Sequence, residues 1–270
     1  MSVLEDDLGF PVPLPSSPRR IVSLVPSLTE ALAVSAPDRL AGVTDWCTHP
    51  PGLDLPRVRG TKNPDRAAIE ALRPDLVVAN REENRRLDVD RLRDAGIPVW
   101  VTVIESLDDS FVSLRRLFVD VLGLDEPDWL TTARAEWARP APEPARTVVV
   151  PIWRDPWMVV GSSTFTGDLL ARLGLENVFG THADRYPRVE VEEIPAAELV
   201  LLPDEPYVFT ADDGPEAFPG RDVVLVSGRD LTWYGPSLAT ARSRLLRLAG
   251  VRRRSDNGED LPPFQGLAGE

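Results

Sequence analysis

Short apolar runs alternate along the chain with stretches whose apolar residues recur every three or four positions. In the first part, continuous apolar runs bounded by Pro, Gly or Asp predict buried strands at 21–25, 40–44, 75–79 and 98–103. Between them, helical spacing and helix-start residues predict helices at 28–34, 65–72 and 88–95. Strands that carry no polar face and alternate with helices are typical of a parallel sheet covered by helices.

The second part of the chain repeats this order. Strands are predicted at 147–150, 198–202 and 223–226, a short strand or turn at 177–179, and helices at 167–173 and 236–248. The segment "ALRPDLVVAN" of the first part has a counterpart, "AAELVLLPDE", in the second. The sequence therefore predicts an α/β protein of two similar β/α lobes.

Between the two parts, apolar residues of 107–121 follow i, i+3, i+4, i+7 spacing and predict an amphipathic helix, followed by a second helix at 129–138. Alternate prolines at 140–144 predict a stiff extended linker. The first residues are rich in Pro and acidic side chains without periodicity. We expect the following organisation: 1–19 flexible lead-in; 20–104 N-terminal lobe; 105–146 connecting helical segment and Pro-rich linker; 147–250 C-terminal lobe; 251–270 polar C-terminal tail.

Charge and cysteine content narrow the function. The 270 residues include 43 acidic and 30 basic side chains, a formal net charge of −13, which disfavours binding to nucleic acid and to anionic membranes. Cys47 is the single cysteine, so no internal disulfide is expected. The start of the chain shows neither a basic n-region nor an apolar h-region, no lipobox cysteine follows, and no apolar stretch is long enough to span a bilayer. As written, the sequence predicts a soluble, cytoplasmic protein.

Catalytic and metal-binding motifs are not found. The chain contains no GxGxxG, GxxxxGK[ST], HExxH or GxSxG pattern, and its two histidines are His49 and His182. The spacing of Cys47 and His49 would suit a metal pair or a thiol with its base, but two ligands are too few for a tight site. A loop cysteine beside a solvated histidine is the simpler interpretation. We therefore expect no catalytic residue, no metal site and no catalytic cofactor.

Tryptophans are concentrated where a ligand would bind. Trp46, Trp153, Trp157 and Trp233 fall in or beside loops that follow predicted strands. Ligands of open α/β sheets bind outside the carboxyl ends of the strands, and an indole offers a broad apolar face with one N–H donor. The alternative is that these side chains only pack. The pattern favours a bulky planar ligand.

Polar residues cluster at the same strand ends. Ser27, followed three residues later by Glu30, has the pattern of a helix N-cap and would place backbone donors beside a ligand. The alternative is a set of ordinary caps and solvated loop residues. The candidate polar contacts are Pro26, Ser27, Thr61, Lys62, Asn80, Arg81, Arg154 and Tyr234.

Several motifs together resemble the helical-backbone (class III) periplasmic binding proteins: "RIVSLVPSLTEAL", "AGVTDWCTHPP", "GLENVFG", "YPRVEVEEI" and "GRDLTWYGPSL". The chain is most similar to the vitamin B12 (cobalamin) binding proteins of ABC importers, with iron–siderophore binding proteins as near relatives. The resemblance spans about residues 19–250. It implies two Rossmann-like lobes joined by a long backbone helix, with the ligand, cobalamin or another metal chelate, in the cleft between the lobes.

The resemblance also implies site residues. Pro26 and Ser27 match the first ligand loop, and Trp46 and Cys47 fall where the family often has a Tyr beside the corrin. Thr61, Lys62, Asn80 and Arg81 match further loops of the first lobe, and Trp153, Arg154, Trp157, Trp233 and Tyr234 match loops of the second. Family members place a glutamate on each lobe to dock an ABC permease; here Glu192 occupies one such position and Ala67 the other. A monomer is expected.

Three functions remain open at this point. The first is a non-enzymatic receptor, which would serve an ABC importer if the chain is exported and would act as a cytoplasmic carrier or sensor if it is not. The second is an enzyme of tetrapyrrole or metal-cofactor handling that uses Lys62, His49 or Asp155 as acid or base. The third is an interaction protein that has kept the fold and lost its ligand.

Overall fold

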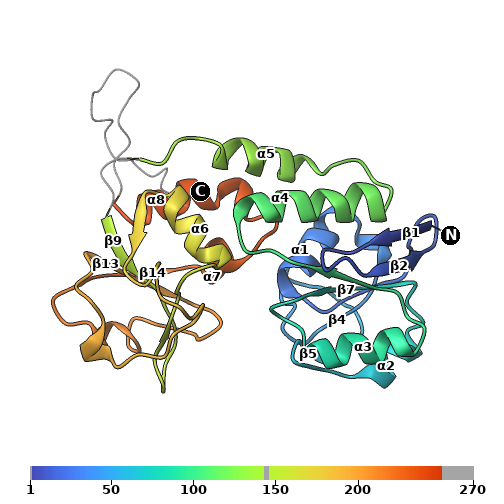
Figure 1. The fold of residues 1–270 in the computed structure, drawn as a ribbon, viewed down its shortest axis with the longest axis horizontal. Helices are drawn as coiled ribbons and strands as arrows, with labels where there is room; N and C mark the ends of the chain where they lie inside the picture. The colour runs from blue at the N-terminus through green and yellow to red at the C-terminus, as the bar shows by residue number, and fades with distance from the viewer. Residues whose placement is uncertain (1, 143–145, 251–270) are drawn as a thin grey trace. The chain divides into compact units, whose positions relative to one another are not determined.

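The computed structural model describes residues 2–142 and 146–250 and divides into two compact units (Figure 1). Of the described residues, unit 1 comprises 2–104, 108–132 and 234–236, and unit 2 comprises 105–107, 133–142, 146–233 and 237–250. The expected tail 251–270 and residues 143–145 of the expected linker lie outside the described residues.

Unit 1 is built on a four-stranded parallel sheet in the order β4-β3-β7-β8. Its elements are β3 (Ile21–Ser23), α1 (Pro26–Ser35), η1 (Pro37–Arg39), β4 (Leu40–Val43), β5 (Arg59–Gly60), β6 (Asn63–Pro64), α2 (Arg66–Ala71), β7 (Leu76–Asn80), α3 (Arg86–Asp94) and β8 (Val99–Thr102). All residues of β7 and β8 are buried, because helices and connecting segments cover the sheet. The continuous apolar runs of the sequence therefore predicted these strands correctly.

The start of α1 differs from the expected capping box. The helix begins at Pro26, its N-cap is Val25 without a side-chain hydrogen bond, and Ser27 lies inside the first turn, only 3% exposed. Proline suits the first helical position because its fixed φ matches the helix and its missing N–H would have no partner there. The prediction of Ser27 as the N-cap was wrong.

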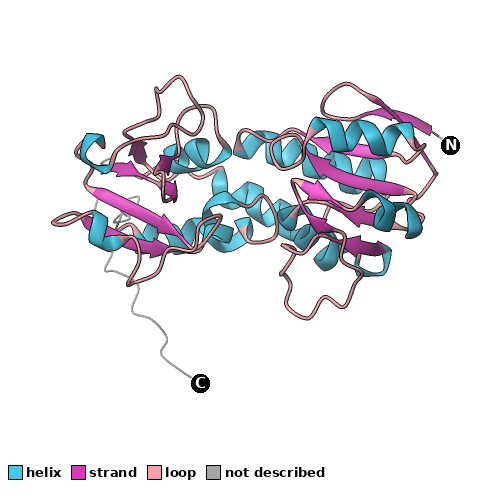
Figure 2. Ribbon diagram, turned by 90° about the horizontal axis from the view of Figure 1, so that it is seen from below, coloured by secondary structure: helices cyan, strands magenta, loops and turns pink. Residues whose placement is uncertain are grey.

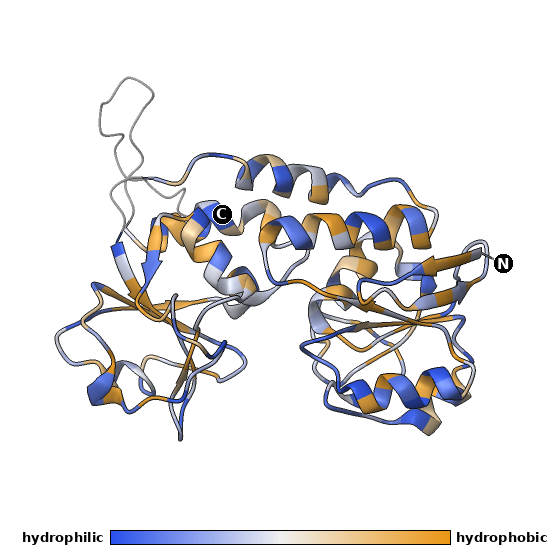
Figure 3. Ribbon diagram, in the orientation of Figure 1, coloured by the Kyte–Doolittle hydropathy of each residue, from blue (hydrophilic) through white to orange (hydrophobic). Residues whose placement is uncertain are grey.

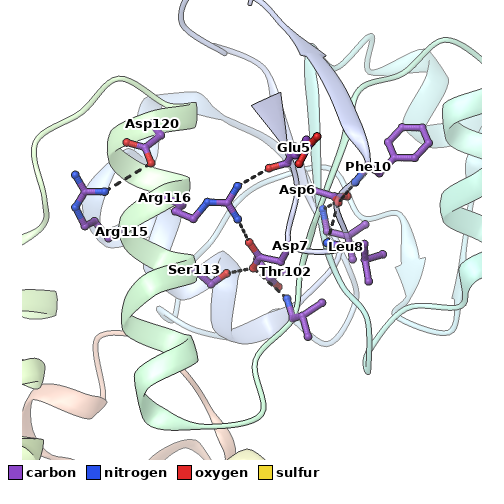
Figure 4. A network of polar contacts seen from close by, with 12 residues as sticks. Glu5, Asp6, Asp7, Leu8, Phe10, Thr102, Ser113, Arg115, Arg116 and Asp120 are labelled. Atoms are coloured by element: carbon purple, nitrogen blue, oxygen red, sulfur yellow. Dashed lines mark hydrogen bonds and ion pairs between the residues drawn. The ribbon is translucent and has the colours of Figure 1, made fainter. Parts of the chain in front are cut away.

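The expected flexible lead-in is wrong as well. Residues 2–14 form an antiparallel hairpin of β1 (Ser2–Glu5) and β2 (Pro11–Leu14), with Val12 and Leu14 buried. Two carboxylates at its turn bind the rest of unit 1 (Figure 4). Asp6 accepts hydrogen bonds from Leu8 N (2.9 Å), Phe10 N (3.0 Å), Val101 N (3.3 Å) and Arg93 Nη2 (2.6 Å).

Asp7 ties the same turn to the helix that follows β8. It accepts hydrogen bonds from Val103 N at 3.1 Å and Ser113 Oγ at 2.5 Å, and pairs with Arg116. Figure 4 shows Arg116 also reaching the Glu5 carbonyl. The hairpin is thus an integral part of unit 1.

The amphipathic helix expected at 107–121 is present as α4 (Leu107–Arg115) and a π-helical continuation, η2 (Arg116–Val121), followed by α5 (Asp128–Trp137). Its apolar side, including Leu117 and Phe118, is buried as the spacing predicted. The structure groups Asp108–Thr132 with unit 1 and not with a separate connecting segment.

Unit 2 repeats the sheet of unit 1 in the order β12-β9-β13-β14, all parallel, so in both sheets the strands lie in the order second, first, third, fourth along the chain. Figure 2 shows strands and helices together in each unit. Figure 3 shows the apolar colouring of these strands. The elements are β9 (Arg146–Val149), β10 (Pro151–Trp153), β11 (Met158–Val159), α6 (Phe165–Arg172), β12 (Leu175–Asn177), η3 (Val191–Glu193), β13 (Leu199–Pro203), η4 (Pro215–Ala217), β14 (Asp222–Val226), α7 (Gly228–Thr232) and α8 (Leu238–Leu248). The prediction of two similar β/α lobes is therefore confirmed.

Within residues 2–142 and 146–250, none of the helices combines the length and apolar character that a bilayer crossing requires.

Candidate functional site

Loops at the carboxyl ends of the unit 1 strands are tied to one another. Asn84, after β7, donates from Nδ2 to the Leu24 carbonyl at 3.3 Å and the Thr61 carbonyl at 2.9 Å. The Lys62 ammonium donates to the carbonyl of Glu82. The structure therefore brings together the loops that follow β3 and β7 and the β5–β6 turn, which carry predicted site residues.

Trp46 is the aromatic side chain that this edge presents to solvent. Its exposed fraction is 67%. A Cβ added to Gly60 would lie 3.2 Å from Trp46 Nε1, so the indole edge lies against the backbone of the β5–β6 turn. Asp45 N donates to the Arg59 carbonyl at 2.8 Å and fixes the neighbouring backbone. One edge of the Trp46 indole is thus held against the protein, while much of the ring faces solvent.

Cys47 points the other way. Its side chain is fully buried, and its sulfur lies 3.0 Å from Thr29 Oγ1 and 3.1 Å from Thr44 Oγ1. Burial raises the pKa of the thiol, although hydrogen bonds from the two threonines counteract the rise. The side chain of Cys47 is therefore closed to solvent in this structure, and a ligand contact by Cys47 stays a prediction.

Asn80 is also used within the protein. It is 2% exposed, and its Nδ2 donates to Thr102 Oγ1 at 3.0 Å. Its Oδ1 accepts from the backbone of Glu82 at 2.8 Å and Glu83 at 3.3 Å. Asn80 therefore shapes the loop that follows β7, whereas Arg81, the next residue, is exposed. The sequence could not distinguish these two neighbours.

The same loop holds a perturbed carboxyl group. Burial raises the pKa of Glu83, and the positive charge of Lys62 counteracts part of that rise. Lys62, exposed on the β5–β6 turn, is the one lysine of the chain. The edge of unit 1 thus offers an indole, a lysine and an arginine beside half-buried acids.

In unit 2, five rings form a row on the β10–β11 hairpin and the segment after β13. Trp153 meets Tyr207 edge to face at 5.8 Å, and Tyr207 meets Phe209 at 4.7 Å. Trp157 stacks on Phe209 at 5.8 Å with planes 7° apart and meets Phe218 edge to face at 5.4 Å. Phe209 and Phe218 are buried, whereas Trp153 remains 43% exposed. Trp157 therefore packs within the unit, and Trp153 is the most exposed ring of the row.

Acidic residues hold Arg154 beside this row. Its guanidinium pairs with Asp213 and Glu216 and lies 5.4 Å from the Trp157 ring centre. The hydrogen bond to Glu216 is the largest cause that raises the pKa of Arg154. Asp213 also accepts from the Tyr207 hydroxyl at 2.6 Å, and this hydrogen bond raises the Tyr207 pKa. The positive charge of Arg154 is thus balanced by the two carboxylates beside it.

The remaining predicted residues are placed as follows. Trp233 and Tyr234 are each 7% exposed, Pro26 is half-buried, and Ser27 is buried in α1. Glu192 is exposed on η3, and Ala67 is exposed near the start of α2. His49 is half-buried, with Nδ1 3.2 Å from Thr48 Oγ1. Of the four loop tryptophans, Trp46 and Trp153 are the exposed pair.

Sequence reasoning missed the residues that hold Trp153 and Arg154. Tyr207, Phe209, Asp213, Glu216 and Phe218 lie more than 50 residues further along the chain, in a segment without a motif. The alternating aromatic residues of "YVF" after β13 were the available signal. Over the described part of the chain, no group of three His, Cys, Asp or Glu side chains could hold a metal ion.

Comparisons with known proteins agree with this architecture. No protein-family profile matches the chain. A vitamin B12-binding protein of Pectobacterium atrosepticum is 26% identical over 189 residues, 66% of this chain and 68% of the relative. One of Vibrio parahaemolyticus is 26% identical over 72% of this chain and 73% of the relative. The chain is thus similar in sequence to vitamin B12-binding proteins over about two thirds of its length.

Solved structures of periplasmic binding proteins share the fold. The periplasmic vitamin B12 binding protein BtuF of Vibrio cholerae superposes with a TM-score of 0.72 at 19% identity, covering 88% of this chain and 98% of that one. A periplasmic heme binding protein from Pseudomonas aeruginosa gives a TM-score of 0.71 at 24% identity, covering 91% and 95%. Two-lobed binding proteins for different ligands thus share the fold of this chain.

Proposed function

We propose that this chain is a receptor for a corrinoid such as vitamin B12 and delivers it to an ABC importer. The observation that carries the proposal is the exposed indole at the carboxyl edge of each sheet, Trp46 in unit 1 and Trp153 in unit 2. Flat apolar rings held from one side suit a broad, flat ligand. The relatives named vitamin B12-binding proteins support the same ligand class.

Three possible iron ligands near the exposed indoles are unsuited to haem. Proteins bind haem iron through His, Cys, Met or Tyr. The Cys47 thiol is buried, Tyr234 is 7% exposed, and the Tyr207 phenol, whose pKa is raised, donates to Asp213 and resists forming the phenolate that binds iron. His49 is half-buried and His182 is exposed, so the separate titration with hemin decides between the two ligands. The cobalt of vitamin B12 carries its own axial base and needs no protein ligand.

Charge supports the same choice. At the exposed face of unit 2, Asp155, Asp213 and Glu216 surround the single guanidinium of Arg154. This acidic surface disfavours the propionates of haem and the anionic groups of ferric siderophores. The amide-bearing rim of a corrin ring is uncharged and both donates and accepts hydrogen bonds.

Delivery requires a surface for a permease and access to the ligand outside the cell membrane. We propose that Glu192, exposed on η3, contacts the permease, and that unit 1, with Ala67 in the matching place, docks without a glutamate there. When Glu192 is replaced by Gln, the rate of import should fall while the affinity for the ligand stays unchanged. Fractionation of the native host tests export directly: a receptor for import is found outside the cytoplasm.

Ligand binding is tested by fluorescence titration of the full chain with cyanocobalamin and, separately, with hemin. We expect cyanocobalamin to quench tryptophan emission at a one-to-one ratio. Trp46→Ala and Trp153→Ala should each weaken binding by about 1–3 kcal/mol, which is roughly fivefold to 150-fold. Trp129→Phe is the matched control, because Trp129 is tied to Ser35 by a hydrogen bond of 2.9 Å away from both edges. Tight hemin binding without cyanocobalamin binding would refute the proposal.

A further inference from the structure

The N-terminal hairpin encloses a second concave surface in unit 1, which we call the hairpin groove. Its walls are the hairpin turn (residues 8–11), the segment after β7 that includes Asn80 and Arg81, one face of α3, and Val101 of β8. Its volume is about 540 Å³, within the usual range for small-molecule sites. The groove was not expected from the sequence, because the hairpin itself was not.

The hairpin wall is held firmly in place. Asp6 accepts four hydrogen bonds, two from its own turn and two from Val101 and Arg93. The Arg93 guanidinium lies 3.7 Å from the centre of the Phe10 ring. The groove is therefore preformed, and a ligand would not have to order this turn when it binds.

The groove combines an apolar wall with positive charge. Leu8 and Phe10 expose 49% and 41% of their surface. Three arginines and one aspartate line the groove, in a chain whose formal net charge is −13. Arg93 is engaged by Asp6, but Arg86 pairs with Asp90 only at 3.4 Å, with its side chain 93% exposed. Such an exposed pair is weak, so Arg86 can turn to an anionic ligand group.

These features fit an aromatic group attached to a phosphate. Vitamin B12 carries such a group, a dimethylbenzimidazole nucleotide on an arm that extends from the corrin ring. Asn80 and Arg81 border the groove and also belong to the loop at the carboxyl edge of the unit 1 sheet. The groove and the loop at this edge therefore share residues, which places them side by side within unit 1.

We propose that the hairpin groove binds the nucleotide arm of the corrinoid, with the base against Leu8 and Phe10 and the phosphodiester at Arg86 and Arg81. The inference rests on the proposed function, because it assumes a corrinoid ligand. It assigns a binding role to the N-terminal hairpin and makes the receptor selective for complete corrinoids.

The test compares cyanocobalamin with dicyanocobinamide, which has the corrin ring but lacks the nucleotide arm. Affinities are measured by calorimetry for the unaltered chain and for Arg86→Ala, Leu8→Ala and Arg91→Ala. Arg91 is the matched control, since it lies on α3 but outside the hairpin groove. Leu8→Ala changes no charge, so it still tests the groove if the loss of a charge in Arg86→Ala disturbs folding. Thermal unfolding shows whether each variant is folded.

We expect the unaltered chain to prefer cyanocobalamin. Arg86→Ala should weaken cyanocobalamin binding by about tenfold to 100-fold, the usual range for one hydrogen bond to a charged group. Leu8→Ala should also weaken it, while cobinamide binding and the Arg91→Ala variant stay unchanged. Equal affinity of the unaltered chain for both corrinoids, or equal losses for both in the variants, would overturn the inference and leave the proposed function intact. If neither corrinoid binds the unaltered chain, the proposed function itself fails.

Discussion

Replacing Asp6 by Asn should detach the N-terminal hairpin from unit 1. The Asp6 side chain is completely buried, and Arg93, its partner, is 14% exposed. One carboxylate oxygen accepts from the Leu8 and Phe10 amides, which an Asn oxygen would still do. The other oxygen accepts from Arg93 and Val101, and an Asn side chain would place its NH2 group, a donor, against these two donors.

The magnitude follows from these contacts. Breaking a buried ion pair while leaving one charge behind costs about 3–5 kcal/mol, and each hydrogen bond to a charged group contributes about 1.5–3 kcal/mol. Arg93 keeps a hydrogen bond to the Val99 carbonyl at 3.2 Å and a little solvent contact, which favours the lower end of that range. We expect Asp6→Asn to destabilise the docked hairpin by about 3 kcal/mol.

Amide hydrogen exchange is the suitable assay, because the hairpin can open while the two units stay folded. A loss of about 3 kcal/mol should speed exchange of the hairpin amides on the order of 100-fold. The control is Asp120→Asn, whose pair with Arg115 at 3.6 Å is exposed and should contribute less than about 1 kcal/mol. Acceleration of the Leu8 and Phe10 amides by less than about fivefold would refute the buried-pair argument.

Three further predictions concern other sites. Cys47 should react with a thiol reagent at pH 8 far more slowly than a free thiol and at the ordinary rate in denaturant, because burial raises its pKa; fast reaction of the folded chain would contradict its placement. Glu83→Gln should stabilise unit 1 at pH 7. The pKa of Glu83 is higher in the folded state than in the unfolded state, so the folded chain holds this proton more tightly. The stability that the protonated carboxyl adds is present below the unfolded-state pKa and is lost as pH rises through the folded-state pKa. Urea unfolding at pH 4 and pH 7 should show the difference at pH 7 only. Gly161→Ala should destabilise unit 2 by about 2 kcal/mol, because its Cβ would lie 2.3 Å from the Asp184 carbonyl oxygen; an unchanged melting temperature would show that this backbone shifts freely.

The inner strands could be predicted because both of their faces are buried, so each reads as an unbroken apolar run. β7 and β13 are examples, and their equivalent places in the two sheets confirm the internal repeat. The hairpin was missed because Pro11 and Pro13 suggested irregular chain. Their alternation with the buried Val12 and Leu14 is a strand period, and proline is tolerated on a short edge strand.

The candidate site could be predicted only to the level of loops. Trp46 and Cys47 are adjacent in sequence, yet one is exposed and the other buried. Which side chain of a loop faces solvent depends on contacts with distant segments, such as Gly60 for Trp46 and Thr29 for Cys47. The carboxylates that neutralise Arg154 also come from a distant segment, so its charge could not be judged from sequence.

Calorimetric titration of the full chain with cyanocobalamin tests the central claim most directly. The exposed indoles of Trp46 and Trp153 predict one bound corrinoid per chain, with affinity greatly reduced when both are replaced by alanine. Heat signals that show no binding, or the same affinity for the unaltered chain and the double variant, would contradict it.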